Sequence, residues 1–177
     1  MLSEQKRDYF KKMVLPYYER AGIVLNPQEK ENIEIADFGL DDYESIGLAI
    51  VIYIHTDRYS SEEMVLLPKQ ICPEHRHPPC KGPLGKQETF RCRMGEVYLY
   101  VEGDSCDRGK MKASLPKEKE ETFTVFHEII LSPGEQYTIP PNTLHWFQAG
   151  VEGAIISEFS SAAYDEYDVF TDPLIIR

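Results

Sequence analysis

Hydrophobic and polar positions follow a helical period at the start of the chain. Between Ser3 and Ala21, apolar and aromatic residues recur every three or four positions, with charged residues between them. Ser3 suits the N-cap of a helix, and Gly22 suits its end. We therefore predict one helix over this range, with an aromatic stripe that packs against the core. The stripe consists of Tyr9, Phe10, Met13, Val14, Tyr17 and Tyr18.

From about residue 33 the pattern changes to short alternating or apolar segments separated by turns rich in Pro, Gly or Asp. Many short strands at such spacing are typical of an antiparallel sandwich or barrel rather than of alternating β–α units. We expect a mainly all-β chain with one domain, in which residues 1–32 form an N-terminal helical extension and residues 33–177 form a β-barrel. The segments with strand character are 33–38, 48–54, 64–67, 97–101, 123–126 and 154–156.

The composition narrows the possible partners. The chain has 177 residues and a formal net charge of -11, and its lysines and arginines are scattered, which argues against a nucleic-acid partner. No apolar run approaches the roughly 20 residues that span a bilayer, and the charged N-terminus lacks a signal-peptide core. The four cysteines form no CxxC pair, so we expect free thiols in a cytoplasmic chain. The lysine-rich segment 104–121 is expected to be an exposed loop.

Two blocks of residues carry candidate chemistry, and the first begins at His75. On a strand, His75 and His77 point to the same face, because side chains alternate with period two. Glu88 opens the next extended segment, at the head of an inward apolar row. A carboxylate in that position needs a partner such as a cation. The row that we expect to share its face consists of Phe90, Cys92 and Met94.

The second block begins at Gly134 and ends at His145. A Pro-Pro-Asn turn directs the chain into a strand on which His145 alternates with Phe147, so Phe147 is expected to line a pocket and Trp146 to pack elsewhere. Three imidazoles and one carboxylate suit manganese, iron, cobalt, nickel or zinc, and octahedral geometry would leave two positions for a chelating substrate. The remaining histidines, His55 and His127, are interpreted as hydrogen-bonded residues without a ligand role.

Both blocks resemble the two motifs of the cupins, in which an HxH pair, a glutamate and a later histidine bind one metal inside an antiparallel double-stranded β-helix, or jelly-roll barrel. Asn142 stands where glycine is common and Ala149 where asparagine often ends the motif. Neither departure changes a ligand. The resemblance implies one divalent metal ion, held by His75, His77, Glu88 and His145.

From about Val65 onward the chain also resembles the bacterial D-lyxose isomerases. The resemblance implies a cytoplasmic homodimer that prefers manganese. It also implies a free monosaccharide as substrate, with D-lyxose and D-xylulose interconverted and D-mannose and D-fructose as a weaker pair. The segments that carry it are 73–77, 139–148, 157–161 and 165–173.

Interconversion of an aldose and a ketose needs a base that takes a proton from one carbon and returns it to the next on the same face. By resemblance this base is Glu158, whose alternative is a surface carboxylate on an edge strand. Lys86 lies two positions before Glu88 and would face the same way in an extended segment. It could stabilise an oxyanion or act as an acid, or it could be a solvated loop lysine.

By resemblance Asp168 hydrogen-bonds sugar hydroxyls or assists proton transfer. Asp165 and Asp172 are rivals for that position, because the sequence does not say which carboxylate enters the pocket.

Three other functions remain open. An oxygen-activating cupin dioxygenase uses the same ligands, a cupin sugar-phosphate isomerase would need a basic cluster for the phosphate, and a sugar-binding module would bind without turnover. The basic residues near the motifs are Arg76, Lys81, Lys86, Arg91 and Arg93.

Overall fold

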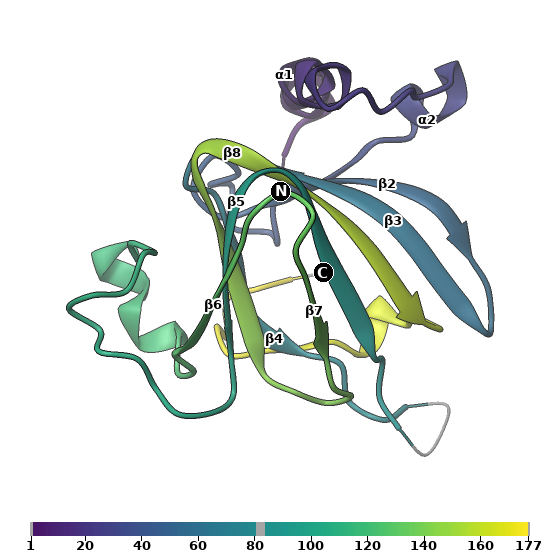
Figure 1. The fold of residues 1–177 in the computed structure, drawn as a ribbon. Helices are drawn as coiled ribbons and strands as arrows, with labels where there is room; N and C mark the ends of the chain where they lie inside the picture. The colour runs from purple at the N-terminus through teal and green to yellow at the C-terminus, as the bar shows by residue number, and fades with distance from the viewer. Residues whose placement is uncertain (1, 81–83, 177) are drawn as a thin grey trace.

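The chain folds into a curled antiparallel sheet that closes into a barrel, with two helices over one end (Figure 1). The computed structural model describes residues 2–80 and 84–176. The mainly β jelly-roll architecture with an N-terminal helix, expected from the sequence, is confirmed. The strands are β1 (Glu34–Ala36), β2 (Leu48–His55), β3 (Tyr59–Leu66), β4 (Ile71–Arg76), β5 (Glu88–Val101), β6 (His127–Leu131), β7 (Gln136–Ile139), β8 (His145–Ser161) and β9 (Val169–Phe170). The helices are α1 (Glu4–Arg20), α2 (Pro27–Glu31) and the 3-10 helices η1 (Lys117–Thr122) and η2 (Asp165–Tyr167).

The long strands β5 and β8 pair along most of their length and belong to both layers of the barrel. Both bend at one place, where Gly95 has φ 76° and Gly153 has φ 75°. A Cβ on Gly95 would lie 2.0 Å from the carbonyl oxygen of Gly153, so the two backbones can approach this closely only with glycine at position 95. Beyond the bend, β8 changes partner from β4 to β3 and β5 changes partner from β7 to β6.

Helix α1 begins and ends where the sequence predicts. The Ser3 hydroxyl accepts a hydrogen bond from the Lys6 backbone N–H, and Gly22 leaves the helix in the left-handed region at φ 68°. Only part of the predicted stripe is buried: Phe10 packs against the barrel, whereas Tyr9 is 58% exposed. The helix covers the outer face of β1, β2, β3 and β8. Where the helix lies over them, these strands are buried on both faces, which explains the apolar run at the start of β2.

Residues 123–126 do not form the strand that their pattern predicts. The backbone N–H groups of Thr124 and Val125 instead donate to the buried carboxylate of Glu74. Phe123 packs edge-on against Trp146, and the strand β6 begins only at His127. The preceding segment 104–121 is mostly exposed, as expected. One of its residues, Ala113, is buried in a small apolar cluster around Trp146.

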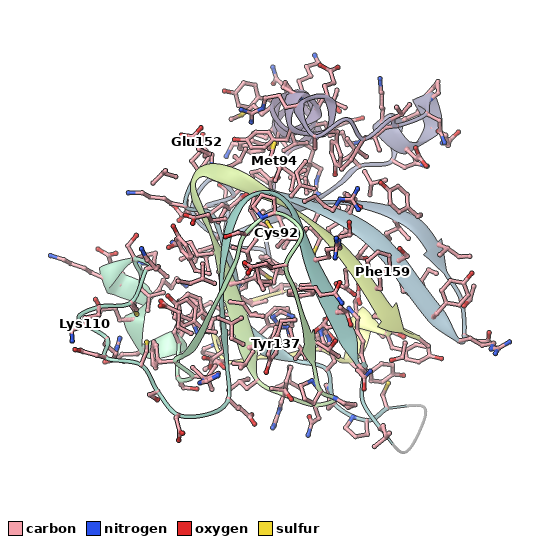
Figure 2. The ribbon with its side chains drawn as sticks, in the orientation of Figure 1. Cys92, Met94, Lys110, Tyr137, Glu152 and Phe159 are labelled. Carbon is pink, nitrogen blue, oxygen red and sulfur yellow. The ribbon has the colours of Figure 1, made fainter. Side chains whose placement is uncertain are left out.

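Met94 does not share a face with Phe90 and Cys92, contrary to the expectation from simple alternation. The register of β5 against β8 shifts between Cys92 and Met94, so the parity of inward positions changes there. Cys92 points into the barrel, and Met94 packs toward α1 (Figure 2).

The four cysteines are free thiols, as expected. In the described part of the chain, no helix has the length and apolar character needed to cross a membrane.

Candidate active site and metal centre

Three histidines from two paired strands meet inside the barrel. His75 lies on β4 directly opposite His145 at the start of β8, and His77 follows β4 by one residue. One ring nitrogen from each lies within 4.8 Å of those from the other two. All three are buried, and His145 is completely so. Parity along the strand therefore brought together the imidazoles that the sequence predicts.

Each of the three imidazoles is oriented by a contact at its Nδ1 atom. These contacts fix the rings so that each Nε2 atom is left for a ligand, which is how metal-binding histidines are commonly held. The ring of His75 also stacks on Phe170 of β9. The Nδ1 partners are the Pro73 carbonyl oxygen at 2.8 Å, the Asp168 Oδ1 atom at 2.5 Å and the Thr143 carbonyl oxygen at 2.9 Å, for His75, His77 and His145 respectively.

Glu88 completes the cluster from the first position of β5. Its Oε1 atom lies 3.3 Å from Nε2 of His77 and 3.1 Å from Nε2 of His145. These three buried atoms have no hydrogen-bond partner among the described residues. Buried polar atoms without partners are costly, and a cation between them would satisfy all three. The donor set of three imidazole nitrogens and one carboxylate oxygen therefore fits a divalent metal ion.

Burial and the charges of the cluster shift the pKa values of its members in different directions. Burial, together with the neighbouring imidazoles, holds the pKa of His75 well below its usual value, so this ring stays neutral as a ligand must. Burial also acts to lower the pKa of His77, but the Glu88 carboxylate and the Asp168 hydrogen bond raise it to about 10. Burial would raise the pKa of Glu88, yet Lys86 and the two histidines hold it well below the usual range. The cluster thus stabilises positive charge next to an ionised Glu88.

Lys86 is buried inside the site and is not a solvated loop residue. Its Nζ atom lies 3.0 Å from Oε2 of Glu88 and 2.5 Å from Oε1 of Glu158. Burial disfavours the ammonium form, but Glu158, Glu88 and Glu62 together raise the pKa of Lys86 well above its usual value. A fixed positive charge therefore stands between the Glu88 carboxylate and Glu158, the predicted base.

Glu158 lies on β8 beyond the bend and is 3% exposed, so it is not a surface carboxylate. Its neighbours across the sheet are Phe90 on β5 and Glu62 on β3. Glu62 lines the same pocket and was not singled out from the sequence. The strand prediction started only at Met64, so the polar first half of β3 gave no signal that position 62 faces inward.

The structure distinguishes the three carboxylates near the C-terminal end. Asp168 contacts His77 at Nδ1 and lines the pocket, so it orients the His77 ring. Asp165 lines the same pocket. Asp172 instead pairs with Lys119 of η1 at 2.5 Å and is not among the pocket residues.

These groups line one cavity inside the barrel. One side is polar, and the other is an apolar wall that includes Phe147, as the sequence predicts. Trp146 points away and packs against Tyr100 with ring centroids 4.0 Å apart. The other apolar residues of the wall are Phe38, Leu48, Ile50, Met64, Cys72, Phe90 and Phe170.

An antiparallel jelly-roll barrel with an inward cluster of histidines and a glutamate defines a cupin with the donor set of a metal site. Solved structures agree on the fold: L-ribose isomerase from Cellulomonas parahominis, solved with L-ribose, has a TM-score of 0.79 and 14% identity, covering 98% of this chain and 94% of that one. L-ribose isomerase from Acinetobacter sp. DL28 has a TM-score of 0.77 with the same coverage.

The model of the D-lyxose isomerase family matches residues 28–176. The whole chain is 58% identical to the D-lyxose/D-mannose isomerase of Thermosediminibacter oceani and 55% identical to the D-lyxose ketol-isomerase of Thermofilum sp., and it covers 97% of each. The chain belongs to the D-lyxose isomerase family, and it is an enzyme, an aldose–ketose isomerase.

Proposed function

We propose that this enzyme interconverts D-lyxose and D-xylulose, and more slowly D-mannose and D-fructose, with one divalent metal ion, preferably Mn²⁺. The metal would be held by His75, His77, Glu88 and His145. The observation that carries the proposal is the convergence of these donors beside a buried Lys86–Glu158 pair. The names of the relatives support the choice of sugars.

When bound, the metal ion supplies a Lewis acid that polarises the sugar carbonyl. The remaining chemistry belongs to the side chains. Glu158 takes the proton from C2 and returns it to C1 on the same face, through a cis-enediol, while the hydroxyl proton moves from O2 to O1. The Lys86 ammonium, which is preorganised within 3.0 Å of Glu88, stabilises negative charge that develops on the sugar oxygen. Asp168 keeps the His77 ring in position through the 2.5 Å contact at Nδ1.

Proton chemistry accounts for these groups better than oxygen chemistry does. A dioxygenase needs the metal ligands and open positions on the metal, but it has no use for an ion pair aimed at the substrate. Lys86 and Glu158 are both buried in the pocket. Removing two charges from water is costly, and their mutual attraction often does not repay that cost. A role in the reaction therefore explains this pair better than a role in stability.

A free sugar fits the pocket better than a sugar phosphate. Phosphate recognition usually uses several arginines or lysines. Among the described residues that line this cavity, Lys86 is the only lysine or arginine, and it is already paired with carboxylates. Arg76 and Arg93 are exposed, and Arg91 bonds to Gln136 on the outside of the barrel. Lys81 lies outside the described residues.

A panel of aldoses tests the proposal. The protein is stripped with a chelator, reloaded with Mn²⁺ and assayed on free D-lyxose, D-mannose and mannose 6-phosphate, with oxygen uptake followed in parallel. We expect metal-dependent turnover of the two free sugars, and deuterium from heavy water at C2 of recovered lyxose, since the base exchanges its proton. A higher rate on the phosphate, oxygen consumption, or pentose binding without exchange would each contradict the proposal.

Substitutions separate the metal ligands from the base. Glu88→Gln and His145→Ala should lose the metal. Glu158→Gln should keep the metal and lose turnover by roughly 10²- to 10⁴-fold, the usual contribution of a general base. Metal content and rate are measured on the same preparations. Full activity in Glu158→Gln would remove it as the base.

The family resemblance supports two further proposals, a homodimer and a cytoplasmic location. Sedimentation of the metal-loaded protein tests the first, and fractionation of the source cells tests the second. We also propose that residues 1–32 are an extension of a single domain formed by the barrel.

A further inference from the structure

A further carboxyl group faces the proposed base from the neighbouring strand. Glu62 on β3 lies directly opposite Glu158 on β8 in the antiparallel register, and both side chains line the pocket. Cross-strand partners of this kind have their Cβ atoms about 5 Å apart, so two inward glutamates meet at their carboxyl groups. The two carboxyls are within reach of a hydrogen bond with each other.

Two carboxyls this close do not both ionise in a buried site unless each has its own cation. The Lys86 ammonium contacts Glu158 at 2.5 Å and Glu88 at 3.0 Å. On the other side Glu62 faces Ile52 of β2, which is apolar. Burial and the charge of Glu158 raise the pKa of Glu62 well above its usual value, against the lowering effect of Lys86, and Asp165 of η2 adds to the rise.

We propose that Glu62 is a positioning residue of the isomerase site, which carries a proton at neutral pH and donates it in a hydrogen bond to the Glu158 carboxylate. Lys86 and Glu62 then hold the base from two directions. During turnover Glu158 takes the proton from C2 and gives it back to C1, the sugar's hydroxyl proton moves from O2 to O1, and the proton of Glu62 stays with the pair throughout. The proposal rests on the proposed role of Glu158 as the base.

Glu63 provides a matched control, because it is the next residue on the same strand and points to the opposite face. It is also a buried carboxyl, and burial raises its pKa, but it accepts its hydrogen bonds from Ser157 and lies outside the pocket. Glu63→Gln therefore makes the same chemical change at a site with no access to the base.

Infrared spectroscopy of the metal-loaded protein without sugar tests for the proton. We expect the difference between wild type and Glu62→Gln to contain the C=O stretching band of a protonated carboxylic acid, and this band to persist in Glu63→Gln. A difference spectrum with only carboxylate bands would overturn the proposal. This readout does not depend on turnover, so an inactive wild type would refute the proposed function and leave the pair to be judged by its spectrum.

Kinetics test the positioning role. Glu62→Gln keeps a neutral donor and should retain kcat to within about threefold, whereas Glu62→Leu should lose roughly 10- to 100-fold in kcat with little change in KM. Metal content and thermal unfolding of each variant show whether it is loaded and folded. At high pH Glu62 of the wild type loses its proton, whereas the glutamine of Glu62→Gln has no such proton to lose. The ratio of wild-type activity to Glu62→Gln activity should therefore fall as the pH rises. Unchanged kcat in folded Glu62→Leu, or Glu62→Gln as impaired as Glu62→Leu, would refute the role.

Discussion

Glu74 is the residue next to His75, the first histidine of the cluster, but its side chain is absent from the pocket lining and is 1% exposed. Its two carboxylate oxygens accept four hydrogen bonds. Oε2 accepts from the backbone N–H groups of Thr124 at 2.6 Å and Val125 at 3.0 Å, and Oε1 accepts from the hydroxyls of Thr124 at 2.8 Å and Thr171 at 2.6 Å. One carboxylate therefore ties β4 to the segment after η1 and to the C-terminal segment.

Two substitutions of Glu74 separate its charge from its hydrogen bonds. In Glu74→Gln the amide oxygen can take the place of Oε2, and the amide nitrogen then faces two hydroxyls, which can rotate to accept. Only the charge assistance is lost, and we expect a cost of about 1–2 kcal/mol. In Glu74→Leu the N–H groups of Thr124 and Val125 lose their acceptor. A buried unsatisfied donor costs about 1–3 kcal/mol, so the total should be roughly 2–6 kcal/mol.

Urea unfolding of the metal-free protein measures these differences without a contribution from metal binding. The control is Glu152→Gln, because Glu152 is exposed on the outside of β8 (Figure 2) and should change stability by less than about 0.5 kcal/mol. The reasoning fails if Glu74→Leu unfolds with the same free energy as wild type, or if Glu74→Gln is the more damaging of the two.

Three further predictions concern the ligand shell, the bend and the thiols. Asp168→Asn should weaken metal affinity by roughly 10- to 100-fold, as measured by competition with a chelator, and unchanged affinity would exclude an orienting role. Gly95→Ala should lower the midpoint of thermal unfolding strongly or prevent folding, because its Cβ would overlap the Gly153 carbonyl; a wild-type midpoint would show that the bend tolerates a side chain. Burial raises the pKa of Cys92 to about 11, so at pH 8 only about one such thiol in a thousand is ionised. Iodoacetamide should therefore alkylate exposed Cys80 first, and mass spectrometry showing Cys92 modified first in folded protein would contradict this.

Periodicity predicted those parts of the site that depend on local geometry. The two imidazoles of His75 and His77 share a face because of strand parity, and Glu88 begins a strand as its apolar row suggests. The alternation rule gave the wrong face for Met94, because the register of β5 shifts between Cys92 and Met94. A one-residue shift of this kind leaves no mark in the pattern of apolar and polar residues. The helical start also followed local rules, with Ser3 as its cap.

The remaining parts depend on contacts between distant segments. The choice among Asp165, Asp168 and Asp172 is decided by which one meets His77, and that contact spans 91 positions of sequence. Residues 123–126 have strand-like composition, but their backbone donors are taken by a glutamate fifty positions earlier. Glu62 gave no signal either. The first half of β3 is polar, so its sequence resembles that of a surface strand, and only the pairing with Glu158 shows that position 62 faces the pocket.

The bent β5–β8 pair has a consequence for how this catalyst could change. His145 and Glu158 lie on opposite sides of the bend in β8, and Glu88 lies at the start of β5, the strand that pairs with β8. The spacing between Glu88, His145 and Glu158 is thus set by the paired strands β5 and β8, which bend at Gly95 and Gly153, and not by the surface connections. Connections that carry none of these side chains, such as the turn between β6 and β7, can therefore be lengthened or exchanged without altering this spacing.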